Sequence, residues 1–74
     1  MDIHFTTEII IKGQPAAYNV TFEGESYHFH PINATHPAFM IKREDDEWHP
    51  QGELDDIAKS QAVSSLEKYL LSQH

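Results

Sequence analysis

Cysteine is absent from the sequence, and glycine and basic residues are scarce: three and five, respectively, among 74 residues. Without cysteine the chain forms no disulfide and has no thiol for nucleophilic catalysis. The few scattered glycines make no phosphate-binding loop of either the G-x-x-x-x-G-K-[ST] or the G-x-G-x-x-G type. No segment approaches the roughly 18 consecutive apolar residues of a membrane-spanning helix. The absences therefore exclude several common kinds of site.

The shortage of basic residues against twelve acidic ones gives a formal charge of -7. Acidic groups repel phosphates, so we expect neither nucleic acid nor an anionic membrane surface as a partner. The first four residues, Met1-Asp2-Ile3-His4, have no basic region and no long apolar region. We therefore expect no secretory signal, and with the lack of cysteine we expect a cytoplasmic protein.

The length predicts a single small domain over residues 1–74. A chain this short buries only about 60% of its unfolded surface. A single core of this size rarely contributes more than about 3–5 kcal/mol of net stability. Because disulfides are excluded, three sources of extra stability stay open: a compact core, an oligomer, or a metal held by histidine. A homodimer is among these expectations, since a second copy would enlarge the core.

Apolar residues alternate with polar ones through the first two thirds of the chain, which is typical of strands with one buried face. We expect strands at 3–11, 18–23, 27–30 and 38–43, with a tight turn at 13–15 and another at 23–26. Trp48 and His49 form either a short fifth strand or a flap. The residues expected to point inward are Ile3, Phe5, Thr7, Ile9, Ile11, Tyr18, Val20, Phe22, Tyr27, Phe29, Phe39 and Ile41.

After Gly52 the spacing changes to that of a helix, which we expect from Asp55 to Leu71. Asp55 and Asp56 suit a helix start, where carboxylates accept hydrogen bonds from free N–H groups. One apolar stripe consists of Ala62, Val63, Leu66, Tyr69 and Leu70. Ile57 and Leu71 fall outside it: Ile57 is expected to meet the preceding loop, and Leu71 is either a frayed helix end or part of an interface.

The prediction is thus an α+β fold: an antiparallel meander sheet of four or five strands, with one C-terminal helix packed on one face. The opposite face then stays open. It is expected to carry His4, Thr6, Glu8, Ile10, Asn19, Thr21, His28, His30, Met40 and Lys42.

Three features together give the chain a resemblance to a known group of proteins. They are the segment 9–15 (Ile-Ile-Ile-Lys-Gly-Gln-Pro), the acidic turn before Trp48, and the closing helix. In this layout the chain resembles small uncharacterised bacterial proteins that fold as a β-meander followed by one helix. The resemblance covers most of the chain and implies neither catalytic residues nor a ligand.

His28 and His30 are the candidate metal ligands. Residues two apart on a strand project to the same side, so both imidazoles are able to approach one ion. His4 is expected on the same face. A zinc site needs three or four ligands, however, and the alternative is that these are polar side chains on an exposed sheet face.

The acidic run Glu44, Asp45, Asp46 and Glu47 and the adjacent Trp48 are the candidate partner-binding residues. The run is either a solvated turn or a docking surface for a basic partner. It lacks the residue order of a calcium-binding loop. Trp48 either closes one end of the core or anchors an interface, two roles that tryptophan often takes.

From these residues we expect a non-catalytic interaction or accessory protein with an unknown protein partner. It would act through the open sheet face, a sheet edge or the acidic loop. The serines show no nucleophile elbow, and neighbouring loop carboxylates do not form a catalytic pair across a cleft. We therefore expect no enzyme activity and no cofactor. The alternative function is a histidine-based metal-binding protein.

Overall fold

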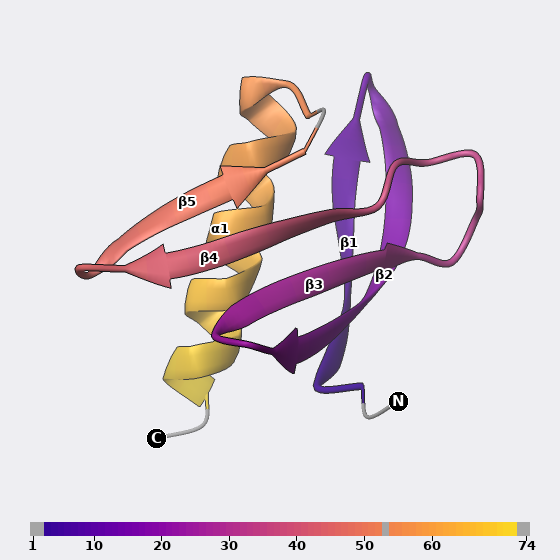
Figure 1. Cartoon of the computed structure of the whole chain (residues 1–74). Coiled ribbons are helices and arrows are strands. Elements are labelled where there is room, and N and C mark those ends of the chain that lie inside the picture. Colours follow the sequence, from indigo (N-terminus) through magenta and orange to yellow (C-terminus); the bar gives the residue numbers. More distant parts are fainter. Residues whose placement is uncertain (1–2, 53, 73–74) are drawn as a thin grey trace.

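A computed structural model describes residues 3–52 and 54–72. Five strands precede one helix, and the strands form one antiparallel sheet in sequence order (Figure 1). This confirms the α+β meander and shows that the segment around Trp48 is a fifth strand. The elements are β1 (Phe5–Ile11), β2 (Gln14–Glu23), β3 (Ser26–Pro31), β4 (Phe39–Glu44), β5 (Glu47–Gln51) and α1 (Asp56–Ser72).

Two-residue turns join β1 to β2, β2 to β3, and β4 to β5. The residues in these turns are Lys12–Gly13, Gly24–Glu25 and Asp45–Asp46, and all six have positive φ. Turns of this kind match the right-handed twist of the flanking strands. The first turn was expected at residues 13–15, which is wrong by one position. Pro15 has a fixed negative φ and so lies within β2 instead of the turn.

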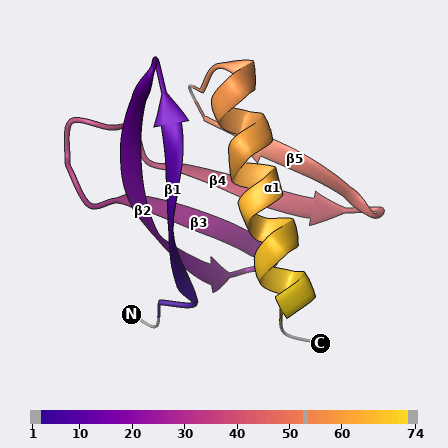
Figure 2. The same ribbon diagram turned by 180° about the vertical axis from the view of Figure 1, so that it is seen from behind.

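The sheet curls because β2 is long and belongs to two pairings. Its ten residues pair with β1 from Gln14 to Val20, but with β3 only from Tyr18 to Glu23. Figures 1 and 2 show β1 and most of β2 aligned with the axis of the helix, whereas β3, β4 and β5 run across that direction. The helix lies in the hollow of this curled sheet. The buried apolar core consists of Ile9, Ile11, Ala16, Tyr18, Val20, Phe29, Phe39, Ile41, Ala58, Ala62 and Leu66.

The helix runs beside β1 in the opposite direction (Figure 2), and polar and aromatic contacts align the two elements. The Ile10 N–H donates to Gln61 Oε1 at 2.8 Å. Farther along, the Thr7 hydroxyl donates to Ser65 Oγ at 2.9 Å. At the helix end the Phe5 and Tyr69 rings stack with centroids 4.3 Å apart. The helix therefore covers part of the β1 edge of the sheet.

Asp55 is the N-cap of α1, one residue before the helix begins. Its Oδ1 accepts a hydrogen bond from the Ala58 N–H at 2.7 Å. We expect Asp55→Ala to lower the free energy of unfolding by about 1 kcal/mol, because that N–H loses its acceptor. Asp56→Ala removes only a charge near the helix dipole and should cost about 0.5 kcal/mol. Urea denaturation followed by circular dichroism measures both, and equal losses would contradict the capping role.

Tyr18 makes stability depend on alkaline pH. Its side chain is buried, and its hydroxyl donates to the Pro37 carbonyl at 2.7 Å. Burial raises the pKa of Tyr18 above the usual 10.0. Above that pH the unfolded chain loses this proton before the folded chain does, so the free energy of unfolding should fall as pH rises. Tyr18→Phe should flatten this decline, measured by urea denaturation at several pH values; an unchanged slope would contradict it.

Candidate functional site

The histidine pair lies on the outer face of β3, as the alternation predicted. The rings of His28 and His30 are nearly parallel, with centroids 6.3 Å apart. His28 Nε2 lies 3.3 Å from the Glu23 carbonyl oxygen, and His30 Nε2 lies 3.0 Å from Thr21 Oγ1. The two Nε2 atoms are thus engaged with different groups of β2 and do not face a shared point.

His4 does not join this pair, although it was expected on the same face. It precedes the first residue of β1, so strand alternation does not set the direction of its side chain. Its ring packs edge-on against Phe22 and Tyr69, at 6.2 and 6.4 Å. Within residues 3–52 and 54–72 no three or more His, Cys, Asp or Glu side chains are placed to hold a metal ion.

The acidic run forms the tip of the β4–β5 hairpin. Asp45 and Asp46 occupy the turn, and Glu44 and Glu47 pair across it. Two exposed ion pairs join this tip to basic neighbours among the described residues, Lys42–Glu44 at 3.4 Å and Arg43–Asp46 at 3.9 Å, and His49 Nε2 lies 3.9 Å from Glu47 Oε2. Exposed pairs of this kind contribute little to stability, so the acidic residues stay available to solvent and to a ligand.

Trp48 lies at the boundary between the core and the surface, which supports its core role and leaves the interface role a prediction. The side chain is half-buried and packs against the core cluster, so it closes one end of the core. Its ring lies 6.0 Å from Tyr27, and the Arg43 guanidinium carbon lies 4.5 Å from the ring centroid. The remainder of the side chain lines an open cleft, where it is accessible to a partner.

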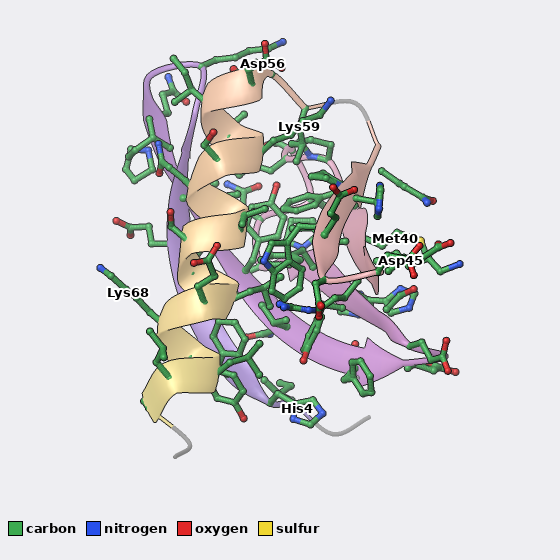
Figure 3. The ribbon with its side chains drawn as sticks, turned by 90° about the vertical axis from the view of Figure 1, so that its left-hand side faces the viewer. His4, Met40, Asp45, Asp56, Lys59 and Lys68 are labelled. Atoms are coloured by element: carbon green, nitrogen blue, oxygen red, sulfur yellow. The ribbon has the colours of Figure 1, made fainter. Side chains whose placement is uncertain are left out.

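This cleft, which we call the hairpin–helix cleft, has a volume of about 560 Å³. One wall comes from the β4–β5 hairpin and the other from the last turns of α1. Figure 3 shows the side of the molecule on which the hairpin and the helix face the viewer, with Asp45 at the hairpin and Lys68 beyond the helix. The lining residues are Arg43, Asp46, Trp48, Glu67, Leu70 and Leu71.

A series of neighbouring rings extends from β1 to this cleft, and we call it the aromatic arc. Consecutive centroids are 4.3 to 6.4 Å apart, within or close to the usual range for aromatic contacts. Phe22, in the middle, is 46% exposed. Strand alternation predicted several of these residues as inward-facing, but the series itself depends on the curl of the sheet, which alternation does not contain. Its members are Phe5, Tyr69, His4, Phe22, Tyr27 and Trp48.

A second cleft, of about 640 Å³, lies at the opposite end of α1. Its titratable side chains are Lys12, His36 and Asp55, and Asp55 already caps the helix. The Thr35 hydroxyl in its wall donates to Asn33 Oδ1 at 3.0 Å. The described side chains of this cleft thus form no hydrogen-bonded pair of a nucleophile and a base.

Comparisons with protein-family models, with curated proteins and with solved structures found no match for this chain. The resemblance to small bacterial meander proteins therefore stays a prediction. Over the part of the chain that the structure describes, no helix combines the length and the apolar character needed to cross a membrane.

Proposed function

We propose that this chain is a non-catalytic interaction or accessory protein that binds a protein partner through the hairpin–helix cleft. The observation that carries the proposal is the pairing of Trp48 on one wall with Leu71 on the other. Leu71 is 74% exposed although it belongs to α1. Tryptophan and tyrosine are enriched among the residues that dominate the binding energy of protein interfaces, and here Trp48 and Tyr27 are neighbours.

The alternatives to this surface are weaker. The β1 edge is partly covered, because the Ile10 N–H is bound to Gln61. The β5 edge contains Pro50, which has no N–H for pairing with an added strand. The centre of the outer face of the sheet is polar, with Asn19, Thr21, His28 and His30. The hairpin–helix cleft combines a concave shape with the exposed Leu71 and the half-buried Trp48.

Burial of Leu71 supplies part of the expected affinity. In the free chain this side chain is mostly in contact with water and stabilises the fold little. A partner that covers it fully would gain about 2 kcal/mol from the hydrophobic effect. The aromatic arc beside it offers a larger apolar surface at low cost in side-chain entropy, because each ring has only two rotatable bonds.

Two matched variants test the proposal. Leu71→Ser removes an exposed apolar side chain from the cleft, and Ile57→Ser removes one of similar exposure, 68%, from the other end of the same helix. Tagged proteins are used to capture partners from native cells, with quantitative mass spectrometry. We expect partners that Leu71→Ser loses and Ile57→Ser retains. If both variants capture the same proteins as the wild type, the cleft is not the binding surface.

We further propose the cytoplasm as the compartment, because a chain without cysteine needs no oxidising environment. Cell fractionation of the untagged protein tests this, and recovery outside the cytoplasm would overturn it.

Histidine-based metal binding is the alternative function, and it is supported by the position of His28 and His30 on one face of β3. Elemental analysis of untagged protein and thermal melts with and without zinc decide it. We expect a higher melting temperature with zinc if the alternative holds, since binding to the folded state stabilises it. An unchanged melt and no bound metal would exclude this function.

A further inference from the structure

We propose that the occupant of the hairpin–helix cleft is a basic peptide segment of another protein, with arginine or lysine beside an apolar anchor residue. This inference rests on the proposed function and specifies the chemistry of the partner. Three features of the cleft support it: an apolar floor, acidic walls, and an arginine of the chain itself that already occupies the cation position.

Both walls of the cleft contribute apolar side chains, which together we call its floor. Trp48 and Leu70 are half-buried, and Leu71 is mostly exposed. The aromatic arc continues this surface through Tyr27 to Phe22, whose rings are 4.7 Å apart. A leucine or aromatic side chain from a partner would find contacts here on several sides, which is how interface anchors gain their affinity.

The charges around this floor are mainly negative. Asp46 and Glu67 line opposite walls, and Asp45 lies at the hairpin turn beside them. Lys68 projects from the opposite side of α1 to Asp45, away from the hairpin (Figure 3). The whole chain carries a formal charge of -7, so the field near the cleft favours a cation. Complementary charge raises association rates and specificity, and its effect weakens in salt.

Arg43 shows that the cleft accepts a guanidinium group. Its guanidinium carbon lies 4.5 Å from the Trp48 ring centroid, and its Nη2 lies 3.9 Å from Asp46 Oδ1. An aromatic face and a carboxylate together are a favourable site for arginine. A partner arginine would compete with Arg43 for this position. Removing the Arg43 charge should therefore strengthen binding of a basic peptide.

A second copy of the chain is a poorer occupant. Two copies would bring the same acidic hairpins together, each from a chain of formal charge -7. Like charges placed opposite each other at an interface oppose association. The same acidic side chains attract a basic segment and repel a second copy of the chain.

The test selects ligands from a random library of short peptides on the immobilised wild-type protein, with Leu71→Ser protein as the counter-selection. We expect the recovered peptides to be enriched in arginine and lysine and to contain at least one leucine or aromatic residue. Binding of the recovered peptides is then measured by fluorescence, because Trp48 is the only tryptophan in the sequence and lines the cleft.

Matched variants assign the binding to the cleft. Asp46→Lys should weaken binding about tenfold, whereas Glu8→Lys, the same charge reversal on an exposed residue of β1, should change it less than about twofold. Leu71→Ser should weaken binding, and Ile57→Ser should not. Arg43→Gln should tighten binding, and added salt should weaken it for every variant that binds.

Other outcomes overturn the inference in distinguishable ways. Recovery of acidic or uncharged peptides whose binding needs Leu71 would keep the cleft as the binding surface but reject the basic occupant. Equal losses from Asp46→Lys and Glu8→Lys would mean that peptides respond to net charge alone, which also rejects it. Sedimentation showing a dimer that Leu71→Ser dissociates would make a second copy the occupant. No enrichment over the Leu71→Ser protein rejects the basic peptide, whereas the capture experiment above tests the proposed function separately.

Discussion

Replacing Phe29 by alanine is expected to unfold most of the protein at room temperature. The side chain is fully buried at the centre of the sheet. Its ring stacks on Phe39 with centroids 4.5 Å apart and meets Tyr18 edge-on at 6.2 Å. Truncating a buried phenylalanine typically costs about 3–5 kcal/mol, because apolar contacts are lost and a cavity is left. A domain of this size has about that much stability in total.

Phe22→Ala is the matched control for this variant. Phe22 and Phe29 lie on adjacent strands, and both point to the concave side, but Phe22 is 46% exposed at the end of the sheet. Its truncation should cost about 1 kcal/mol and leave the protein folded. Circular dichroism and urea denaturation of the two variants measure the difference. Similar losses would show that the core is not centred on the Tyr18, Phe29 and Phe39 rings.

Gly52→Ala should be the second strongly destabilising change, although it adds only a methyl group. The φ of Gly52 is +128°, a conformation that residues with a side chain rarely adopt. The added Cβ would also lie 2.9 Å from the Phe39 Cβ, and Phe39 is part of the buried core. Backbone strain and the displaced core residue together should cost about 2–4 kcal/mol.

Gly13→Ala separates the effect of backbone strain from the effect of contact with Phe39. Gly13 also has a positive φ, +79°, but an added Cβ there meets no atom within 4 Å among the described residues. That variant should lose only about 1 kcal/mol, from strain alone. Thermal or urea unfolding of both proteins gives the comparison. If Gly13→Ala is as harmful as Gly52→Ala, contact with Phe39 is not the reason for glycine at position 52.

Substitutions in the cleft and substitutions in the core should separate effects on binding from effects on stability. The exposed residues proposed to bind the partner, Leu71 and Asp46, contribute little to the core. Their substitution should therefore change peptide binding while the free energy of unfolding stays nearly the same. Phe29→Ala and Gly52→Ala should lower both the free energy of unfolding and the affinity for the peptide, because the aromatic floor of the cleft packs against the same core.

Much of the local structure was predictable from the sequence. Alternation correctly placed Val20, Phe29 and Ile41 in the core. The helix was expected from Asp55 to Leu71, and it runs from Asp56 to Ser72 with Asp55 as its cap. The fold class and the outward position of His28 and His30 followed from the same patterns. These features depend on neighbouring residues in the chain, so a local pattern contains the needed information.

The site was less predictable. The sequence identified Trp48 and the acidic residues 44–47 as candidates, but it left open whether they were exposed turn, core or interface. It left Leu71 as either a frayed helix end or part of an interface and did not identify the wall opposite it, and it placed Phe22 inward although that ring is 46% exposed. It also placed His4 with the wrong neighbours, since that residue packs against Phe22 and Tyr69.

What the sequence alone determined is the direction of each side chain relative to its own strand or helix, because strands repeat every two residues and helices every 3.6. Only the tertiary structure decided which of these surfaces meet. The curl of the sheet accumulates over five strands, and α1 packs beside β1 through contacts such as Ile10–Gln61, between residues far apart in the chain. The cleft between Trp48 and Leu71 exists because of that packing, and no local pattern contains it.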